Sequence, residues 1–153
     1  MAAISITAMA EMMSALLMAG RILTSVNANA AANTAIVLTG FISGDELKAV
    51  FSSAAVFVLP SSHEGLPISL LEALSFGLSC IASGIPANRS VGLDERRYFP
   101  LGDTTALAEK LREFLRNSPA PMEREAIRAW IRETYDWDDV AARTVDVFVS
   151  VAR

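Results

Sequence analysis

The chain has 153 residues, about the size of one domain, and 52% of them are hydrophobic, enough for a sizeable core. Its net charge of −4, from 13 basic and 17 acidic side chains without a long basic run, argues against nucleic-acid or membrane-surface binding as the main role. The single cysteine, Cys80, excludes an intramolecular disulfide and a cysteine-based zinc site, so a reducing cytoplasm fits best.

Residues 1–34 form an atypical Ala/Met-rich segment whose only charged side chains are Glu11 and Arg21. A signal peptide would begin with a basic region, which this segment lacks. A transmembrane helix needs about 20 apolar residues, and Glu11 interrupts the run. We therefore predict a strand followed by a helix here, with membrane association as the minority alternative.

From residue 35 to residue 153 the pattern predicts one Rossmann-like domain. Three short apolar runs, at 35–38, 56–59 and 79–83, predict buried strands. Helical segments separate them, and strands that are apolar on both faces are typical of a parallel sheet covered by helices. Tyr98 and Phe99 predict a further short edge strand.

The predicted helices carry apolar faces at helical spacing. Ser43 and Glu46 have the spacing of a capping box at the start of the first helix. Asp103 is placed to cap a later one, and two more are predicted at 122–134 and 137–151. The side chains expected to face inward are Leu47, Val50, Phe51, Ala54, Ile68, Leu71, Leu74, Leu107, Leu111, Phe114, Leu115, Val140, Val147, Phe148 and Val151, with Trp130, Tyr135 and Trp137 as further packing residues.

The stretch SSHEGLPISLLEA, residues 61–73, contains the only histidine and places Glu64 on a loop and Glu72 on the helix that follows. Ligands of open parallel sheets bind where strands end and helices begin. Pro67 suits the first helical position, which would leave the Ile68 and Ser69 amides free to bind a phosphate at the positive end of the helix. Gly65 would allow a ligand to come close to the backbone.

Two carboxylates beside a phosphate site are best explained as acceptors for hydroxyl groups on either side of the phosphates. One carboxylate can accept hydrogen bonds from both hydroxyls of a vicinal diol. A diphosphate with a polyol at each end describes a nucleotide-sugar. The alternative for Glu72 is a solvated helix face.

The segments FVLPSSHEGLPISLLEAL and GLSCIAS resemble the donor-binding C-terminal half of a retaining glycosyltransferase of the GT-B fold (family 4, group 1). That family carries a Glu, seven residues and a second Glu across the same loop and helix. TGFISGDELKAVFSSAAVFVLP, YFPLGDTTALAEKL and YDW extend the similarity to roughly residues 35–150. The resemblance implies a Rossmann-like parallel sheet with extra C-terminal helices, which takes part in hexose transfer from a nucleotide diphosphate sugar. It implies no cofactor and no bound metal.

The resemblance also assigns roles to individual residues. Glu64 would be the catalytic carboxylate beside the transferred sugar, where positive charge develops at the anomeric carbon. Glu72 would hold the ribose hydroxyls, and His63 would lie at the rim of the site. The remaining donor-binding positions, around the sugar and distal phosphate or beside the base, would be Gly65, Leu66, Pro67, Ile68, Gly40, Phe41 and Ile42.

A complete enzyme of this family has an N-terminal domain that binds the acceptor, and a basic pair that neutralises the diphosphate. This chain shows neither, so we expect it to be inactive alone, as a fragment, split subunit or remnant. Residues 1–34 fit the family poorly, through divergence or an out-of-frame reading. The alternatives are a non-catalytic module that binds a nucleotide-sugar or a protein, and part of a nucleotide-sugar epimerase. A position at the inner membrane face would come only through a lipid or polysaccharide acceptor.

Overall fold

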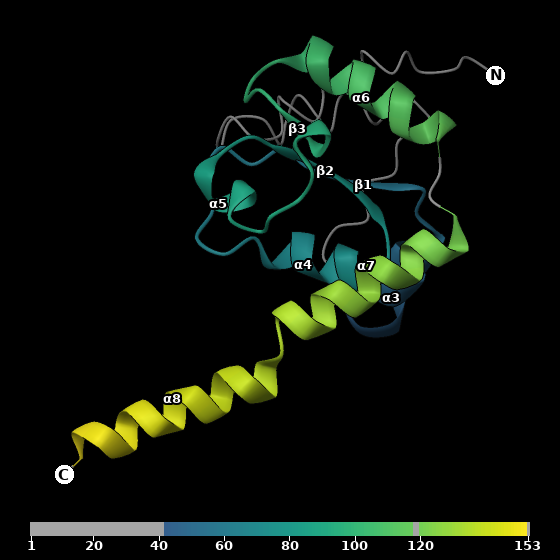
Figure 1. Ribbon diagram of the computed structural model, residues 1–153. Helices are drawn as coiled ribbons and strands as arrows, with labels where there is room; N and C mark the ends of the chain where they lie inside the picture. Colours follow the sequence, from purple (N-terminus) through teal and green to yellow (C-terminus); the bar gives the residue numbers. More distant parts are fainter. Residues whose placement is uncertain (1–41, 118–119, 153) are drawn as a thin grey trace.

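The computed structural model describes residues 42–117 and 120–152, so segment 1–34 and the strand predicted at 35–38 lie outside it. Helices and strands alternate along the described chain (Figure 1). In order they are α3 (Gly44–Ser53), β1 (Val56–Leu59), α4 (Ile68–Ser75), β2 (Ser79–Ser83), α5 (Pro86–Arg89), the 3-10 helix η1 (Glu95–Arg97), β3 (Tyr98–Phe99), α6 (Thr104–Arg116), α7 (Pro121–Thr134) and α8 (Trp137–Val151).

The described strands form a parallel sheet in the order β1-β2-β3, as the sequence predicts. Val56 pairs with Ser79 and Leu59 with Ala82, so β1 and β2 end at the same edge. Ser83 pairs with Phe99, which makes β3 the short edge strand expected from its two aromatic residues. The carboxyl ends of the strands therefore meet at one edge, where this class of sheet binds its ligands.

Helices cover both faces of the sheet, with α6 on one side and α4 and α7 on the other (Figure 1). The residues of β2 are all buried and alternate between the two faces. Cys80 and Ala82 belong to the core beneath α4, while Ile81 belongs to the core beneath α6. This arrangement confirms the predicted α/β class.

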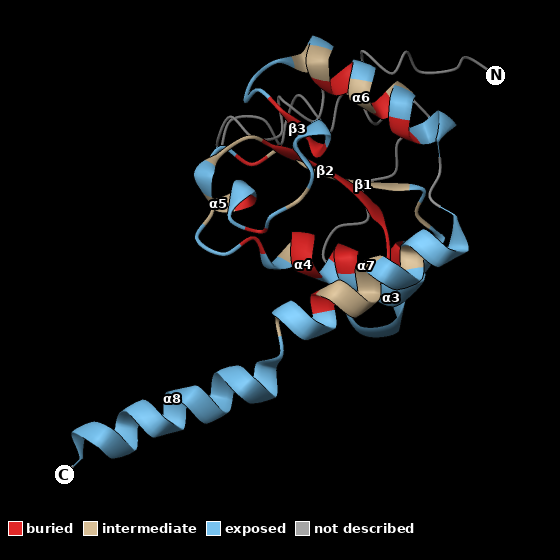
Figure 2. Ribbon diagram, viewed as in Figure 1, coloured by how far each residue is buried: buried red, intermediate tan, exposed pale blue. Residues whose placement is uncertain are grey.

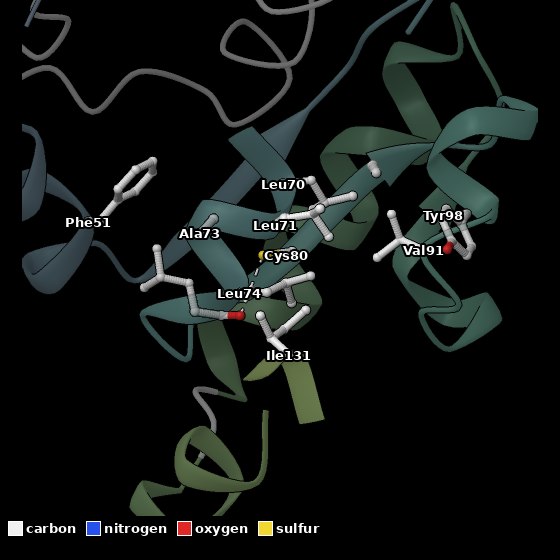
Figure 3. Packing of buried hydrophobic residues seen from close by; sticks show 11 residues of the cluster. Phe51, Leu70, Leu71, Ala73, Leu74, Cys80, Val91, Tyr98 and Ile131 are labelled. Carbon is white, nitrogen blue, oxygen red and sulfur yellow. Dashed lines mark hydrogen bonds between the residues drawn. The ribbon is translucent and has the colours of Figure 1, made fainter. Parts of the chain in front are cut away.

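The larger core joins α4 to the sheet and to α7 (Figure 3). Its fully or almost fully buried members are Phe51, Leu70, Leu71, Ala73, Leu74, Leu78, Cys80, Ala82, Val91, Tyr98 and Ile131. The smaller core consists of Ile81, Phe99, Leu107, Ala108, Leu111 and Phe114. Apolar burial on both faces is the main force that fixes the sheet between the helices.

On α3, α4 and α6, three residues expected to face inward are exposed instead. Val50, Ile68 and Leu115 have 46%, 45% and 47% of their surface accessible. On these helices the core-facing stripe is narrower than the apolar pattern suggests, and Phe51, Leu71 and Phe114 are the buried members. The helical period was predicted correctly, and the width of the buried stripe was not.

The helix ends differ in how they are capped. Asp103 accepts a hydrogen bond from the Ala106 amide at 2.8 Å, which confirms its predicted role. Ser43 stands at the N-cap of α3, but its side chain makes no capping hydrogen bond, so the predicted capping box is wrong. Beyond α4, Gly77 has a φ of 71°, and a Cβ there would lie 2.7 Å from the Arg124 carbonyl oxygen on α7. Glycine therefore permits both the turn and the close approach of α7.

Helix α8 projects away from the rest of the described chain, and none of its residues is buried (Figures 1 and 2). Its inward-facing positions from the sequence pattern, among them Val140, Val147 and Phe148, are all exposed. The helix was predicted correctly, whereas its burial was not.

Candidate functional site

The loop between β1 and α4 lies at the carboxyl edge of the sheet. Strand β1 ends at Leu59, and α4 begins at Ile68 with the buried Pro67 at its N-cap, one position before the predicted one. Pro67 has φ −76° and ψ 73°, and the Ile68 amide donates to the Leu66 carbonyl oxygen at 2.8 Å. This is an inverse γ-turn. It contradicts the prediction that the Ile68 amide is free; the Ser69 amide is the one at this helix start with no acceptor among the described residues.

Glu64 is held at this edge by a serine that the sequence reasoning missed. The Ser61 hydroxyl donates to Glu64 Oε1 at 2.5 Å, and Ser61 itself is buried two residues after β1. The Glu64 side chain is half-buried. A hydroxyl that donates to one carboxylate oxygen fixes the orientation of the whole group.

A buried chain of hydrogen bonds continues inward from Ser61. The Ser83 hydroxyl, at the end of β2, donates to the Ser61 carbonyl oxygen at 2.5 Å. The Asn88 carboxamide on α5 donates from Nδ2 to both Oγ and the carbonyl oxygen of Ser83, each at 3.0 Å. These three residues come from the loop after β1, from β2 and from α5, and they meet at the same edge of the sheet.

Glu72 faces a different space from Glu64. A cavity of about 350 Å³ lies between α4 and the junction of α7 with α8. Its lining residues are Ile68, Leu71, Glu72, Ser75, Ile131, Arg132, Tyr135 and Trp137. The cavity therefore places a carboxylate beside two aromatic rings and a guanidinium group. Trp137 is 62% exposed, so the prediction that it packs in the interior is wrong.

The other predicted site residues are placed as follows. A Cβ added to Gly65 would meet no atom within 4 Å, so the backbone there is open to an approaching ligand. His63 and Leu66 are exposed on the same loop, and Ile42 is half-buried. Gly40 and Phe41 lie outside the described residues.

One cation is anchored close to the carboxyl edge. Arg89 Nε donates to the carbonyl oxygen of Gly84, directly after β2, at 3.0 Å. Its guanidinium also pairs with Glu95 and lies 4.8 Å from the centre of the Tyr98 ring. The hydrogen bond with Glu95 raises the pKa of Arg89, so this side chain keeps its charge.

A second cavity, of about 230 Å³, lies at the opposite end of β2, where Ser79 begins the strand. Arg97 lines it and is buried, 3.8 Å from Glu123 and 5.3 Å from the centre of the Phe114 ring. Its guanidinium also donates to the Cys80 carbonyl oxygen at 3.5 Å. These contacts indicate that Arg97 has a structural role. It lies away from the edge of the sheet where a ligand would bind.

The family assignment follows from comparison with known proteins. The model of the family "Glycosyl transferases group 1" matches residues 3–117, about three quarters of the chain and most of segment 1–34 as well. The chain belongs to the group 1 glycosyltransferases.

Two relatives of this glycosyltransferase domain illustrate the similarity. The chain is 35% identical over 107 residues to a phosphatidyl-myo-inositol mannosyltransferase of Mycobacterium leprae, a match that covers 68% of the chain and 29% of the relative. It is 37% identical over 109 residues to the sulfoquinovosyl transferase SQD2 of Arabidopsis thaliana, which covers 66% of the chain and 21% of the relative. The chain thus spans less than a third of the curated relatives it matches.

A solved structure supports the fold. The catalytic domain of cholesterol-alpha-glucosyltransferase from Helicobacter pylori superposes with a TM-score of 0.61, over 86% of this chain and 90% of that one, at 20% identity. The group 1 domain is thereby part of a GT-B fold. Within the described residues, no helix is long and apolar enough to cross a bilayer. In the same part of the chain, no three His, Cys, Asp or Glu side chains are grouped as metal ligands.

Proposed function

We propose that this glycosyltransferase domain binds a nucleotide diphosphate sugar at the carboxyl edge of its sheet and takes part in hexose transfer with retention of anomeric configuration. One observation carries the proposal: Glu64 and Glu72 flank the start of α4 but face different surroundings. Glu64 is held by Ser61 at the end of β1, whereas Glu72 lines the cavity beside Tyr135 and Trp137. Two separated carboxylates suit a ligand that carries hydroxyl groups at both ends.

In this proposal the sugar lies beside Glu64 and the ribose beside Glu72. The open backbone at Gly65 and the Ser69 amide, which has no acceptor within residues 42–117 and 120–152, lie between the two carboxylates in the sequence, at the positive end of α4. These donors would bind the diphosphate. Leu66, Pro67 and Ile68 would shape the loop around it, and His63 would lie at the rim of the site. Gly40, Phe41 and Ile42 would lie beside the base.

The transfer step breaks the bond between the anomeric carbon and the phosphate oxygen, and forms a bond from the anomeric carbon to an acceptor hydroxyl oxygen. The acceptor proton passes to the departing phosphate, so no protein nucleophile is required. Glu64 opposes the positive charge that develops on the sugar, and preorganised donors stabilise the leaving diphosphate.

Complete catalysis would require the part of the relatives that this chain does not span. We propose that this part supplies the acceptor site and the basic groups for the diphosphate, and that the assembled enzyme works in the cytoplasm, reaching a membrane only through its acceptor. A non-catalytic nucleotide-sugar-binding module is the second candidate. It is favoured by the limited cationic charge at the site, where Arg89 is already paired with Glu95.

Calorimetric titration of the purified chain with UDP, GDP, UDP-glucose and GDP-mannose tests the donor site. We expect saturable binding of one nucleotide family, weakened about tenfold by Glu72→Ala, because a charged acceptor of two hydroxyl donors is lost. Glu46→Ala removes an exposed carboxylate from α3 and serves as the matched control. A folded chain that binds none of the four ligands contradicts the proposal.

A further inference from the structure

We propose that Ser61, Ser83 and Asn88 are positioning residues that hold the Glu64 carboxylate in the orientation in which it meets the transferred sugar. The proposal rests on the donor site proposed above and adds residues to which neither the motif nor the family match assigns a role. The hydrogen bonds that link them form one connected path from the interior to Glu64.

The direction of each hydrogen bond in this path is fixed by the chemistry of its donor. The Asn88 Nδ2 group can only donate, and it donates to Ser83 Oγ. The Ser83 hydroxyl has one proton, which it gives to the Ser61 carbonyl oxygen. The Ser61 hydroxyl gives its own proton to Glu64 Oε1. All donors in the path therefore point toward Glu64.

Burial makes this path rigid. Ser83 and Asn88 are 0% exposed and Ser61 is 7% exposed, so water does not compete for the inner bonds. The Asn88 backbone is held as well, because its carbonyl oxygen accepts a hydrogen bond from the Tyr98 hydroxyl at 3.1 Å. The path is thus anchored to β3 at one end and reaches the loop at the other.

The burial of Asn88 carries an energetic cost. Its Oδ1 atom is buried and has no hydrogen-bond partner among the described residues, which is unfavourable in a protein interior. An apolar side chain of similar size would avoid that penalty. The carboxamide is consistent instead with a requirement for its two Nδ2 hydrogen bonds to Ser83.

The need for such support follows from the position of Glu64 on the loop between β1 and α4, where no helix or strand sets its direction. Ser83 fixes the Ser61 backbone, and the hydroxyl on that same residue fixes Glu64 Oε1. Glu64 Oε2 has no hydrogen-bond partner among the described residues, so it is available to a ligand. A loop carboxylate held through one oxygen is preorganised for contact through the other.

The test compares ligands with and without the sugar. Affinities for UDP and UDP-glucose, and for GDP and GDP-mannose, are measured on the wild-type chain and on Ser61→Ala. Because Glu64 faces the sugar, we expect about three- to tenfold weaker binding of the nucleotide-sugar, with binding of the nucleoside diphosphate unchanged. Ser83→Ala should likewise lower the affinity for the nucleotide-sugar relative to that for the nucleoside diphosphate, because the Ser61 carbonyl oxygen loses its hydrogen-bond donor.

Two serine variants serve as controls. Ser62→Ala removes an exposed hydroxyl beside Ser61, and Ser79→Ala removes a buried hydroxyl at the opposite end of β2. Neither should change the ratio of the affinity for the nucleotide-sugar to that for the nucleoside diphosphate.

Equal weakening of the binding of both ligands by Ser61→Ala would indicate a general loss of packing and overturn the proposal. No change in either affinity would overturn it as well. If the wild-type chain binds the nucleotide-sugar no more tightly than the nucleoside diphosphate, Glu64 makes no measurable contact with the sugar. That result also overturns the proposal. Binding of neither ligand refutes the donor site itself, and the positioning role with it.

Discussion

Helices α6 and α8 both carry an apolar face, but only the face of α6 is covered within the described chain. Leu107, Ala108, Leu111 and Phe114 of α6 are buried against the sheet, whereas α8 has no buried residue (Figure 2). Both helices have an aspartate at the N-cap that accepts backbone hydrogen bonds. The comparison shows that periodicity and capping determine where a helix forms, while its burial depends on which partner is present.

The two helices also differ in what stabilises them. A helix of this length is marginal on its own, and most helical stability in proteins comes from packing. Helix α8 contains five valines, which are poor helix formers, and its visible support is local: the Asp136 cap and the ion pair of Arg143 with Asp139 at 2.8 Å. Its apolar face is not covered by any other part of the described chain.

The largest expected effect comes from the covered face of α6. Leu107→Ala removes a fully buried side chain from the smaller core and should lower the free energy of unfolding by about 2–5 kcal/mol. Leu115→Ala, on the exposed side of the same helix, should change it by less than about 0.5 kcal/mol. Urea denaturation followed by circular dichroism measures both. Similar losses in the two variants would show that α6 is not anchored through this face.

Most helices and strands between α3 and α7 were predicted from the sequence because their signals are local. The runs 56–59 and 79–83 and the Asp103 cap each depend on neighbouring residues alone. The Ser83 contact with Ser61 joins residues 22 positions apart, and it exists only because β1 and β2 pair in parallel. No local pattern reveals such a contact.

The candidate site was predictable in outline and not in detail for the same reason. The loop position of Glu64 and the helix position of Glu72 follow from the motif, and the structure confirms both placements. The association of Glu72 with Tyr135 and Trp137 depends on how α7 packs on α4. The inverse γ-turn at Pro67, which occupies the Ile68 amide, depends on a single ψ angle that residue type does not fix.

The pH dependence of the free energy of unfolding tests whether water reaches Cys80 in the larger core. Burial raises the pKa of the Cys80 thiol from 9.0 to about 12, an effect partly opposed by the charge of Arg97. Below pH 9 the thiol is protonated in both states; above it, the unfolded chain loses the proton while the folded chain keeps it. Stability should therefore fall as the pH rises from 9 toward 12, at a slope of up to about 1.4 kcal/mol per pH unit.

Burial also raises the pKa of Tyr98, which lowers the stability at high pH in the same direction. Comparison with Cys80→Ala, which keeps Tyr98, isolates the contribution of the thiol. The free energy of unfolding of the wild type, taken relative to that of the variant, should be about 2 kcal/mol lower at roughly pH 10.5 than at neutral pH. Parallel curves for the wild type and the variant would mean that water reaches the thiol in the folded chain.

The smallest effect is expected on α8. Phe148 is 68% exposed, and Phe148→Ser should change the free energy of unfolding of this chain by less than about 0.5 kcal/mol. Burial of the same ring against a partner would make the substitution much more damaging, since a buried phenylalanine contributes several times that amount. Denaturation of the chain alone, and then of the chain joined to the part of a relative that it does not span, separates the two cases. A loss above about 1 kcal/mol in the chain alone would show that the α8 face is already covered in solution, and the contrast with α6 would disappear.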